Sequence, residues 1–259
     1  MKNTKKFSSM IVLVMAAIIA VFIIAPITAF IIAPPETIED HVEKALDFLL
    51  QYEAEYESMD MASIFLMSEV GERAGSQELR QKMDAIFETY NGPDSIYKKL
   101  LDPSYGAEDF ENSGYLGTAS GNAVLRGIYC NDYPLETKHV DDIKNIDDGG
   151  YDTAHALLGL YFAKERGCFD GAVLEDAMDV LSDRIVSDQE GESFSDIFAE
   201  RTAVLLMTGY PEKVRSEWIH EIANNQSEDG SWCHGGECRG NNLIHTTGFS
   251  AIALIEYNR

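Results

Sequence analysis

A repeat is the feature that most constrains how this chain of 259 residues can fold. Four segments begin with a threonine and continue with small and apolar residues. Each follows a turn that holds an acid or asparagine, a glycine and an aromatic residue. The segments start at Thr118, Thr153, Thr202 and Thr247. Their spacings of 35, 49 and 45 residues are typical of stacked helical hairpins, each with a polar outer helix and an inner helix of small residues. Ordinary helix–turn–helix alternation in an irregular bundle is the alternative.

The rest of the pattern predicts an all-α protein. Thr37 and Asp40 resemble a capping box that opens a first helix, and Ser76 is typical of a residue that opens another. No run of alternating β-branched residues indicates a sheet. After the first helix, the predicted helices cover residues 59–73, 76–90, 118–130, 135–145, 153–166, 172–186, 198–207, 211–225 and 246–257.

Two segments near the carboxyl end resemble known families. Residues 226–232, QSEDGSW, resemble the Gln–Trp repeat of squalene and hopene cyclases. Residues 245–254 are similar to the His-Thr segment of protein prenyltransferase β subunits. Both resemblances imply an (α/α) toroid of about five helical hairpins, the first at 41–73, with concentric helices and a cavity at one mouth of the ring. A fold shared in this way implies architecture more than activity.

The catalytic motifs of those families are incomplete in this chain. Class II cyclases use an Asp-x-Asp-Asp motif, which Asp141-Asp142 and Asp147-Asp148 do not match. The prenyltransferase resemblance implies a zinc ion held by Asp, Cys and His. His245 alone matches in its own motif, whereas Asp229 and Cys233 lie in a different register.

Cysteines and histidines gather near one of the turns. The string Trp232-Cys233-His234-Gly235 is similar to strings of lanthionine cyclases, whose zinc ligands come from two separated loops. Chemically, Cys233, His234, Cys238 and His245 could complete a tetrahedral site. The sequence favours a protein without a cofactor. The alternative is a zinc ion, held either by Asp229, Cys233 and His245 or by the four cysteine and histidine residues just named.

The amino terminus predicts a membrane anchor. Three lysines precede residue 7, and Ile11–Ala33 follows without a charge. These 23 residues would span about 34 Å as a helix, enough to cross a hydrocarbon core of about 30 Å. The alternative is a cleaved signal peptide, but the apolar stretch is long for one and lacks an A-x-A site. The positive-inside tendency then puts residues 1–10 in the cytoplasm and the domain at 36–259 outside it.

Charge excludes one class of partner. Forty-four acids against twenty bases give a net charge of −24, and residues 36–259 alone carry −27. Nucleic acids are captured by clustered Lys and Arg, so this acidic domain is not expected to bind them.

The four cysteines predict two disulfides in an exported domain. Cys130 and Cys168 end two successive inner helices, so they should lie near each other. Cys233 and Cys238 bracket a Gly-Gly turn, which lets a short loop close. Zinc binding and unpaired thiols are the alternatives.

Candidate site residues stand near the predicted starts of inner helices, which converge on one mouth of a toroid. His155, Glu200 and His245 are the candidate catalytic groups, because histidine exchanges protons near neutral pH and a carboxylate tunes it. Arg201, next to Glu200, is a further candidate, and the two residues are also consistent with a solvated ion pair. Tyr151 and Trp232 are expected to provide a stacking surface for a ligand.

The resulting expectation is a membrane-anchored extracytoplasmic toroid that binds a ligand, such as a glycan, a peptide or an isoprenoid, at the mouth of the ring. Its partners are then the membrane, through the N-terminal helix, and an unidentified small molecule, polymer or protein. The sequence does not decide whether the domain is an enzyme. A non-catalytic interaction module of the cell envelope is the competing interpretation.

Overall fold

A computed structural model describes residues 36–52, 59–92, 94–106, 119–146, 150–169, 171–233 and 239–259, without the side chains of 119–122. The chain divides into two compact units, Met1–Thr37 and Ile38–Arg259, and the second contains all helices of the described residues. None of those helices is long and apolar enough to cross a membrane. The expected span at 11–33 lies outside the described residues.

The described part of the second unit is all-α, as the sequence predicts. Its helices are α2 (Ile38–Gln51), α3 (Met61–Arg73), α4 (Gln77–Thr89), η2 (Ser95–Leu100), α5 (Ala119–Ile128), α6 (Thr137–Lys144), α7 (Tyr151–Glu165), α8 (Ala172–Gln189), α9 (Asp196–Met207), η5 (Pro211–Lys213), α10 (Ser216–Asn224) and α11 (Gly240–Tyr257), where η marks a 3₁₀ helix.

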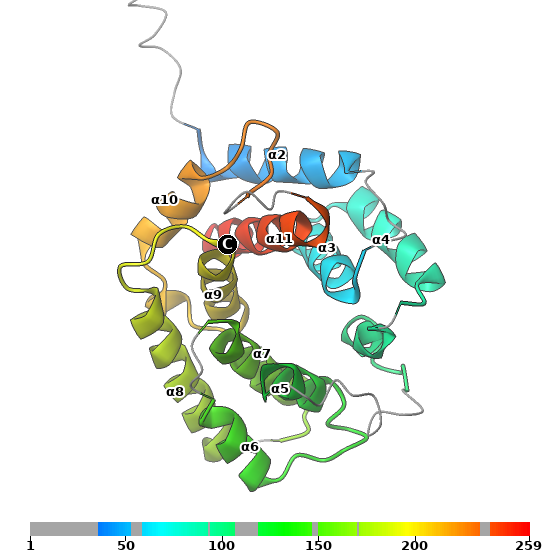
Figure 1. Ribbon diagram of the computed structural model, residues 1–259, viewed down its shortest axis with the longest axis vertical. Helices are drawn as coiled ribbons and strands as arrows, with labels where there is room; N and C mark the ends of the chain where they lie inside the picture. The colour runs from blue at the N-terminus through cyan, green and yellow to red at the C-terminus, as the bar shows by residue number, and fades with distance from the viewer. Residues whose placement is uncertain are drawn as a thin grey trace, which may run out of the picture. The chain divides into compact units, whose positions relative to one another are not determined.

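Helices alternate between two layers along the chain. In the inner layer, α5 packs on α7, α7 on α9, α9 on α11 and α11 on α3, while η2 contacts both α3 and α5. In the outer layer, α2 and α10 pack on α11, α4 on α3, α6 on α8, and α8 on α7. Figure 1 shows α2 and α8 on the outside of the unit, with α11 and α9 inward of them. Each described outer helix therefore precedes an inner helix in the chain.

Inner helices are buried because small and apolar residues occupy most of their positions, which is typical of helices enclosed in a core. In α9, every residue from Phe198 to Met207 is buried, and in α11 the same holds from Thr246 to Ile255. Glycines let two of these helices come close together. A Cβ at Gly127 would overlap the backbone carbonyl of Gly159, and a Cβ at Gly159 would overlap that of Ala123. The small residues of the repeat thus permit the close crossing of α5 and α7.

Most predicted helix positions are confirmed, but some boundaries differ. Ser76 is the N-cap of α4, where its hydroxyl accepts a hydrogen bond from the N–H of Leu79. The helix predicted at 211–225 is instead η5 followed by α10, because Val214 between them is extended and ends the first turn. The last inner helix begins at Gly240, not at Thr246, and η2 was not predicted.

The Gln–Trp segment ties the last hairpin to the first helix. The side-chain amide of Gln226 donates to the carbonyl of His41 and to that of Gly230, at 2.9 Å each. Its carbonyl oxygen lies 2.6 Å from Nδ1 of His41. Gly230 has a φ of +90°, and a Cβ there would overlap the carbonyl of Lys44. This segment is therefore a structural clamp between α2 and the turn before α11.

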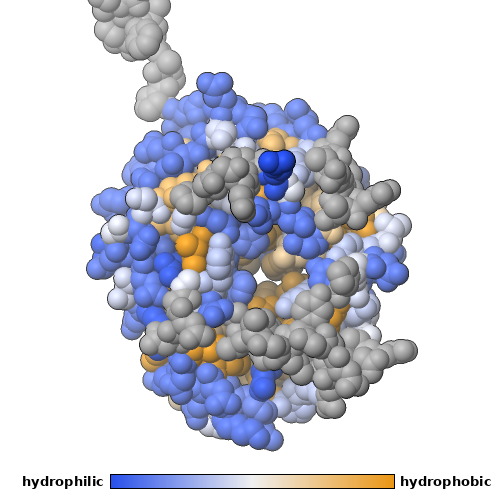
Figure 2. All heavy atoms as spheres, in the orientation of Figure 1, coloured by the Kyte–Doolittle hydropathy of each residue, from blue (hydrophilic) through white to orange (hydrophobic). Residues whose placement is uncertain are grey.

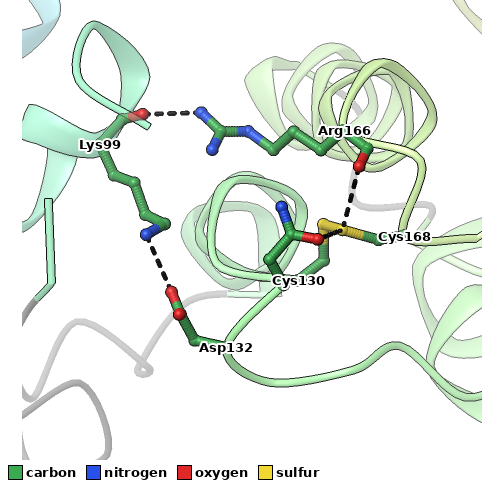
Figure 3. The surroundings of a disulfide bond; sticks show 6 residues. Lys99, Cys130, Asp132, Arg166 and Cys168 are labelled. Atoms are coloured by element: carbon green, nitrogen blue, oxygen red, sulfur yellow. Dashed lines mark hydrogen bonds and ion pairs between the residues drawn. A yellow bond between two sulfur atoms is a disulfide. The ribbon is translucent and has the colours of Figure 1, made fainter. Parts of the chain in front are cut away.

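One predicted disulfide is confirmed. Cys130 and Cys168 follow α5 and α7, and their sulfurs are bonded at 2.03 Å. Figure 3 shows this bridge together with Lys99 of η2, which is linked to Asp132 and Arg166. The Lys99 ammonium, which is almost fully buried, lies 2.8 Å from Asp132, and Arg166 donates to the Lys99 carbonyl at 2.7 Å. The bridge and these polar contacts together fasten η2 to the α5–α7 pair.

The second predicted bridge falls partly outside the described residues. Cys233 is itself disulfide-bonded, and Cys238 lies outside the described part of the chain. A cysteine in a disulfide has no thiolate to offer a metal. Zinc held by Asp229, Cys233 and His245 is therefore not supported.

Candidate functional site

The three candidate catalytic residues converge, each from the second turn of a different inner helix. His155 comes from α7, Glu200 from α9 and His245 from α11. Oε1 of Glu200 lies 3.1 Å from Nε2 of His155, and Oε2 lies 3.7 Å from Nε2 of His245. Glu200 thus stands between two imidazoles that are 90 residues apart in the chain.

Asp196 joins this group, although the sequence analysis did not single it out. It is the first residue of α9, one turn before Glu200 on the same face of the helix. Its carboxylate lies 3.0 Å from Nδ1 of His245 and accepts hydrogen bonds from Thr246 Oγ1 at 2.6 Å and Tyr151 Oη at 2.7 Å. The predicted helix began at residue 198, so Asp196 was placed outside it. The Ser195 N-cap was the signal that could have moved the boundary.

Glu200 is the most buried charge of this group. Its side chain is 0% exposed, whereas those of His155 and His245 are 32% and 23% exposed. Neither of its oxygens accepts a well-aligned hydrogen bond from the described residues. A buried carboxylate without a strong partner is costly, so the two imidazoles beside it are its principal compensation.

The pKa values of these groups follow from that arrangement. Burial lowers the pKa of His155, but the Glu200 charge and contact more than offset this, so the net shift is upward. Burial also lowers the pKa of His245, while the hydrogen bond to Asp196 and the charges of Glu200 and Asp196 raise it above its ordinary value. Burial raises the pKa of Asp196, yet its contacts with His245, Thr246 and Tyr151 bring it below the usual value. These contacts therefore favour the protonated form of both imidazoles and the ionised form of Asp196.

A pocket of about 350 Å³ opens beside this cluster, a volume within the usual range for small-molecule sites. His155 and His245 belong to its wall, together with Asp60 and Asp94. The remaining lining residues are mostly apolar: Ala62, Phe65, Leu66, Tyr97, Leu100, Val124, Leu158, Phe162 and Phe249. Figure 2 shows apolar residues inside a hollow near the centre of this unit, within a mostly hydrophilic surround. The pocket thus combines an apolar body with a small number of polar groups.

Two of the other predicted site residues lie in different places. Tyr151 is 42% exposed and stands next to the cluster, with its ring centroid 6.3 Å from that of His245. Trp232 is a correction, because its indole is 0% exposed and donates to the carbonyl of Ile222 at 2.7 Å. An indole enclosed in this way stabilises the core and offers no stacking surface to a ligand.

Arg201 and Asp229 have structural partners. Arg201 is buried and donates to the carbonyl of Asp188 at 3.2 Å, so it is not a solvated pair with Glu200. The Asp229 carboxylate accepts from the N–H and the hydroxyl of Ser231, at 3.0 and 2.7 Å. These contacts occupy Asp229 in the turn before α11.

Comparisons with protein-family models, with curated proteins and with solved structures found no significant match.

Proposed function

We propose that residues 36–259 form an (α/α) toroid that binds a small amphipathic ligand in the pocket beside His155 and His245. The succession of contacts from α5 through α7, α9 and α11 to α3, with η2 between α3 and α5, supports the toroid. The alternation of outer and inner helices along the chain supports it as well.

The ligand class follows from the lining of the pocket, and this is the observation that carries the proposal. Most of the wall is apolar, which favours a hydrocarbon body and disfavours a glycan. The polar wall contains two carboxylates, Asp60 and Asp94, and Asp196 and Glu200 stand behind the imidazoles. These acids repel an anionic head group, so the polar part of the ligand is a neutral or cationic group, such as a hydroxyl or an amine.

Placement outside the cytoplasm, with the 11–33 segment as anchor, is part of the same proposal. The Cys130–Cys168 disulfide supports it, because disulfides persist in oxidising compartments. An anchored domain also has direct access to amphipathic molecules that leave the bilayer.

Photo-crosslinking tests the proposed ligand class. The full-length protein in lipid nanodiscs is exposed to a long-chain alcohol, amine or carboxylate that carries a diazirine, and the labelled peptides are identified by mass spectrometry. We expect the alcohol and the amine to label peptides that contain Phe65, Phe162 and Phe249, and the carboxylate to label them weakly.

An obstructing variant and its control complete the design. Ala62 lines the pocket yet is exposed, so Ala62→Trp narrows the entrance without disturbing the core. Labelling should then fall by about tenfold, which corresponds to about 1.4 kcal/mol of binding free energy. Ala85→Trp, at an exposed position of α4, should leave labelling unchanged. The proposal would be contradicted if Ala62→Trp left the labelling of these peptides unchanged.

A further inference from the structure

We propose that Glu200, His155 and His245 bind one divalent transition-metal cation, with Asp196 orienting His245. This inference concerns the polar end of the pocket described above. It does not depend on whether an amphipathic ligand enters the apolar part, so the two proposals can fail separately.

The first argument is the burial of Glu200. Its carboxylate is 0% exposed, and neither oxygen accepts a well-aligned hydrogen bond from the described residues. Buried charges in proteins are paired or coordinate metals. A carboxylate with both oxygens directed at imidazole nitrogens has the surroundings of a metal ligand.

The second argument is distance. Two of the proposed ligands, Glu200 and His245, offer ligand atoms that lie within 4.8 Å of each other and of a carboxylate oxygen of Asp196, the residue that orients His245. Two ligands at about 2.0–2.1 Å from a tetrahedral ion stand about 3.3 Å apart. The Glu200 oxygens lie 3.1 Å from Nε2 of His155 and 3.7 Å from Nε2 of His245, on either side of that value. Each of the two pairs of Glu200 and a histidine is therefore spaced close to what two ligands of one ion require.

The third argument is the second nitrogen of His245. A metal-binding histidine usually donates its other ring N–H to a carboxylate, which fixes the tautomer and directs the free nitrogen at the ion. Nδ1 of His245 lies 3.0 Å from Asp196, and Nε2 faces Glu200. Thr246 and Tyr151 donate to the same Asp196 carboxylate and hold it in place. Asp196 is accordingly a positioning residue.

The donor set decides the class of ion. Imidazole nitrogens with carboxylate oxygens, and without thiolates, suit zinc and the late first-row metals better than calcium or magnesium. A bound cation displaces one proton from each imidazole, and Glu200 and Asp196 then bring two negative charges that a divalent cation balances. The partial exposure of His155 and His245 leaves a route for the ion to enter from solvent.

Metal titration of the full-length protein tests this proposal. The protein in nanodiscs is treated with a chelator, dialysed, and titrated with Zn²⁺ alone by calorimetry, with metal content measured on the washed complex. We expect one zinc per chain. Co²⁺ in place of Zn²⁺ should give a visible ligand-field band without the thiolate charge-transfer band that a cysteine ligand would produce.

Variants separate this site from scattered binding to the acidic surface. Glu200→Gln and His245→Ala should each weaken zinc binding by about a hundredfold or more, and Asp196→Asn by about ten- to a hundredfold. His220→Ala and Glu217→Gln, at exposed positions of α10, should bind zinc as the unchanged protein does. Circular dichroism identifies any variant that fails to fold. If a variant does fail, the Co²⁺ spectrum of the unchanged protein still tests which kinds of side chain bind the ion.

Three results would overturn the proposal. They are the absence of stoichiometric zinc binding, zinc binding that Glu200→Gln and His245→Ala both retain, and a thiolate band in the Co²⁺ spectrum. Crosslinking of the amphipathic probe by the metal-free protein would still support the pocket in each case.

Discussion

Nδ1 of His245 lies 3.0 Å from Oδ1 of Asp196, although 49 residues separate the two in the chain. The contact joins the start of α9 to the second turn of α11 and fixes the ring of His245 against Glu200. Two adjacent inner helices thus bring a carboxylate, an imidazole and a second carboxylate into successive contact. His155 of α7 adds a further imidazole next to Glu200.

The metal-free protein should lose stability as the pH rises above about 6.5. The pKa values of His155 and His245 are raised above 6.5 in the folded state. Their contribution is therefore fully present below the unfolded-state pKa and is lost as the pH rises through the folded-state values. The melting temperature, measured from pH 5 to about 9 with a chelator present, should decline across this range.

Glu200→Gln provides the control for that pH dependence. The amide removes the charge that holds both imidazoles protonated, so the decline should become shallower. His220→Ala, on the exposed side of α10, should keep the full slope. Equal slopes in the unchanged protein and in Glu200→Gln would show that the Glu200 charge does not govern these histidines.

Loss of the Cys130–Cys168 bridge should lower the free energy of unfolding by about 2–4 kcal/mol, mainly because the unfolded chain regains freedom. The bridge closes a loop between residues 38 apart and secures the end of the α5–α7 pair. Urea unfolding of Cys130→Ser/Cys168→Ser against the unchanged protein measures this difference. Stability that is unaffected by the double substitution would mean that the polar contacts of Lys99 suffice by themselves.

Gly159→Ala should destabilise the domain by about 1–3 kcal/mol, the usual cost of forcing extra volume into a packed core. The new methyl group would overlap the carbonyl of Ala123 and push α7 away from α5. Gly106→Ala is the matched control, since a Cβ there has no neighbour within 4 Å. Urea unfolding of both variants gives the comparison, and equal stability would refute the close crossing of these helices.

Gln226→Ala should loosen α2 more than any other element. The substitution removes the hydrogen bonds that connect the last hairpin to His41, at a cost of about 1–3 kcal/mol. Hydrogen–deuterium exchange should show faster exchange in α2, while α7 and α9 stay protected. Gln81→Ala, at an exposed position of α4, serves as the control. Uniform loss of protection across the unit would contradict a local clamp.

Topology can be measured in intact cells with a membrane-impermeant thiol reagent. Glu217→Cys lies on the exposed side of α10 and should be labelled, because the domain is expected outside the cytoplasm. Asn3→Cys, within the basic tail, should be labelled only after the cells are opened. The reverse pattern would overturn the proposed orientation.

The sequence by itself determined the local features of this protein. Caps and breakers act within a few residues, so Ser76 and the glycine turns located helix ends. The repeat showed which helix ends occupy equivalent positions in successive hairpins. Because Cys130 and Cys168 both follow inner helices of successive hairpins, the sequence predicted that they would meet. Residue types near the starts of inner helices also identified His155, Glu200 and His245.

Tertiary structure alone decided which side chains face one another. A helix with one apolar stripe reveals its buried face, but α9 and α11 are buried on all sides over most of their length and have no such stripe. The rotation of each inner helix is set by packing against its neighbours, through contacts such as Gly127 on Gly159. Trp232 is enclosed in the core, where its indole donates to the carbonyl of Ile222 in α10. The packing of α9 on α11 turned Asp196 toward His245, because these two residues are 49 apart in the chain and meet only when the two helices pack.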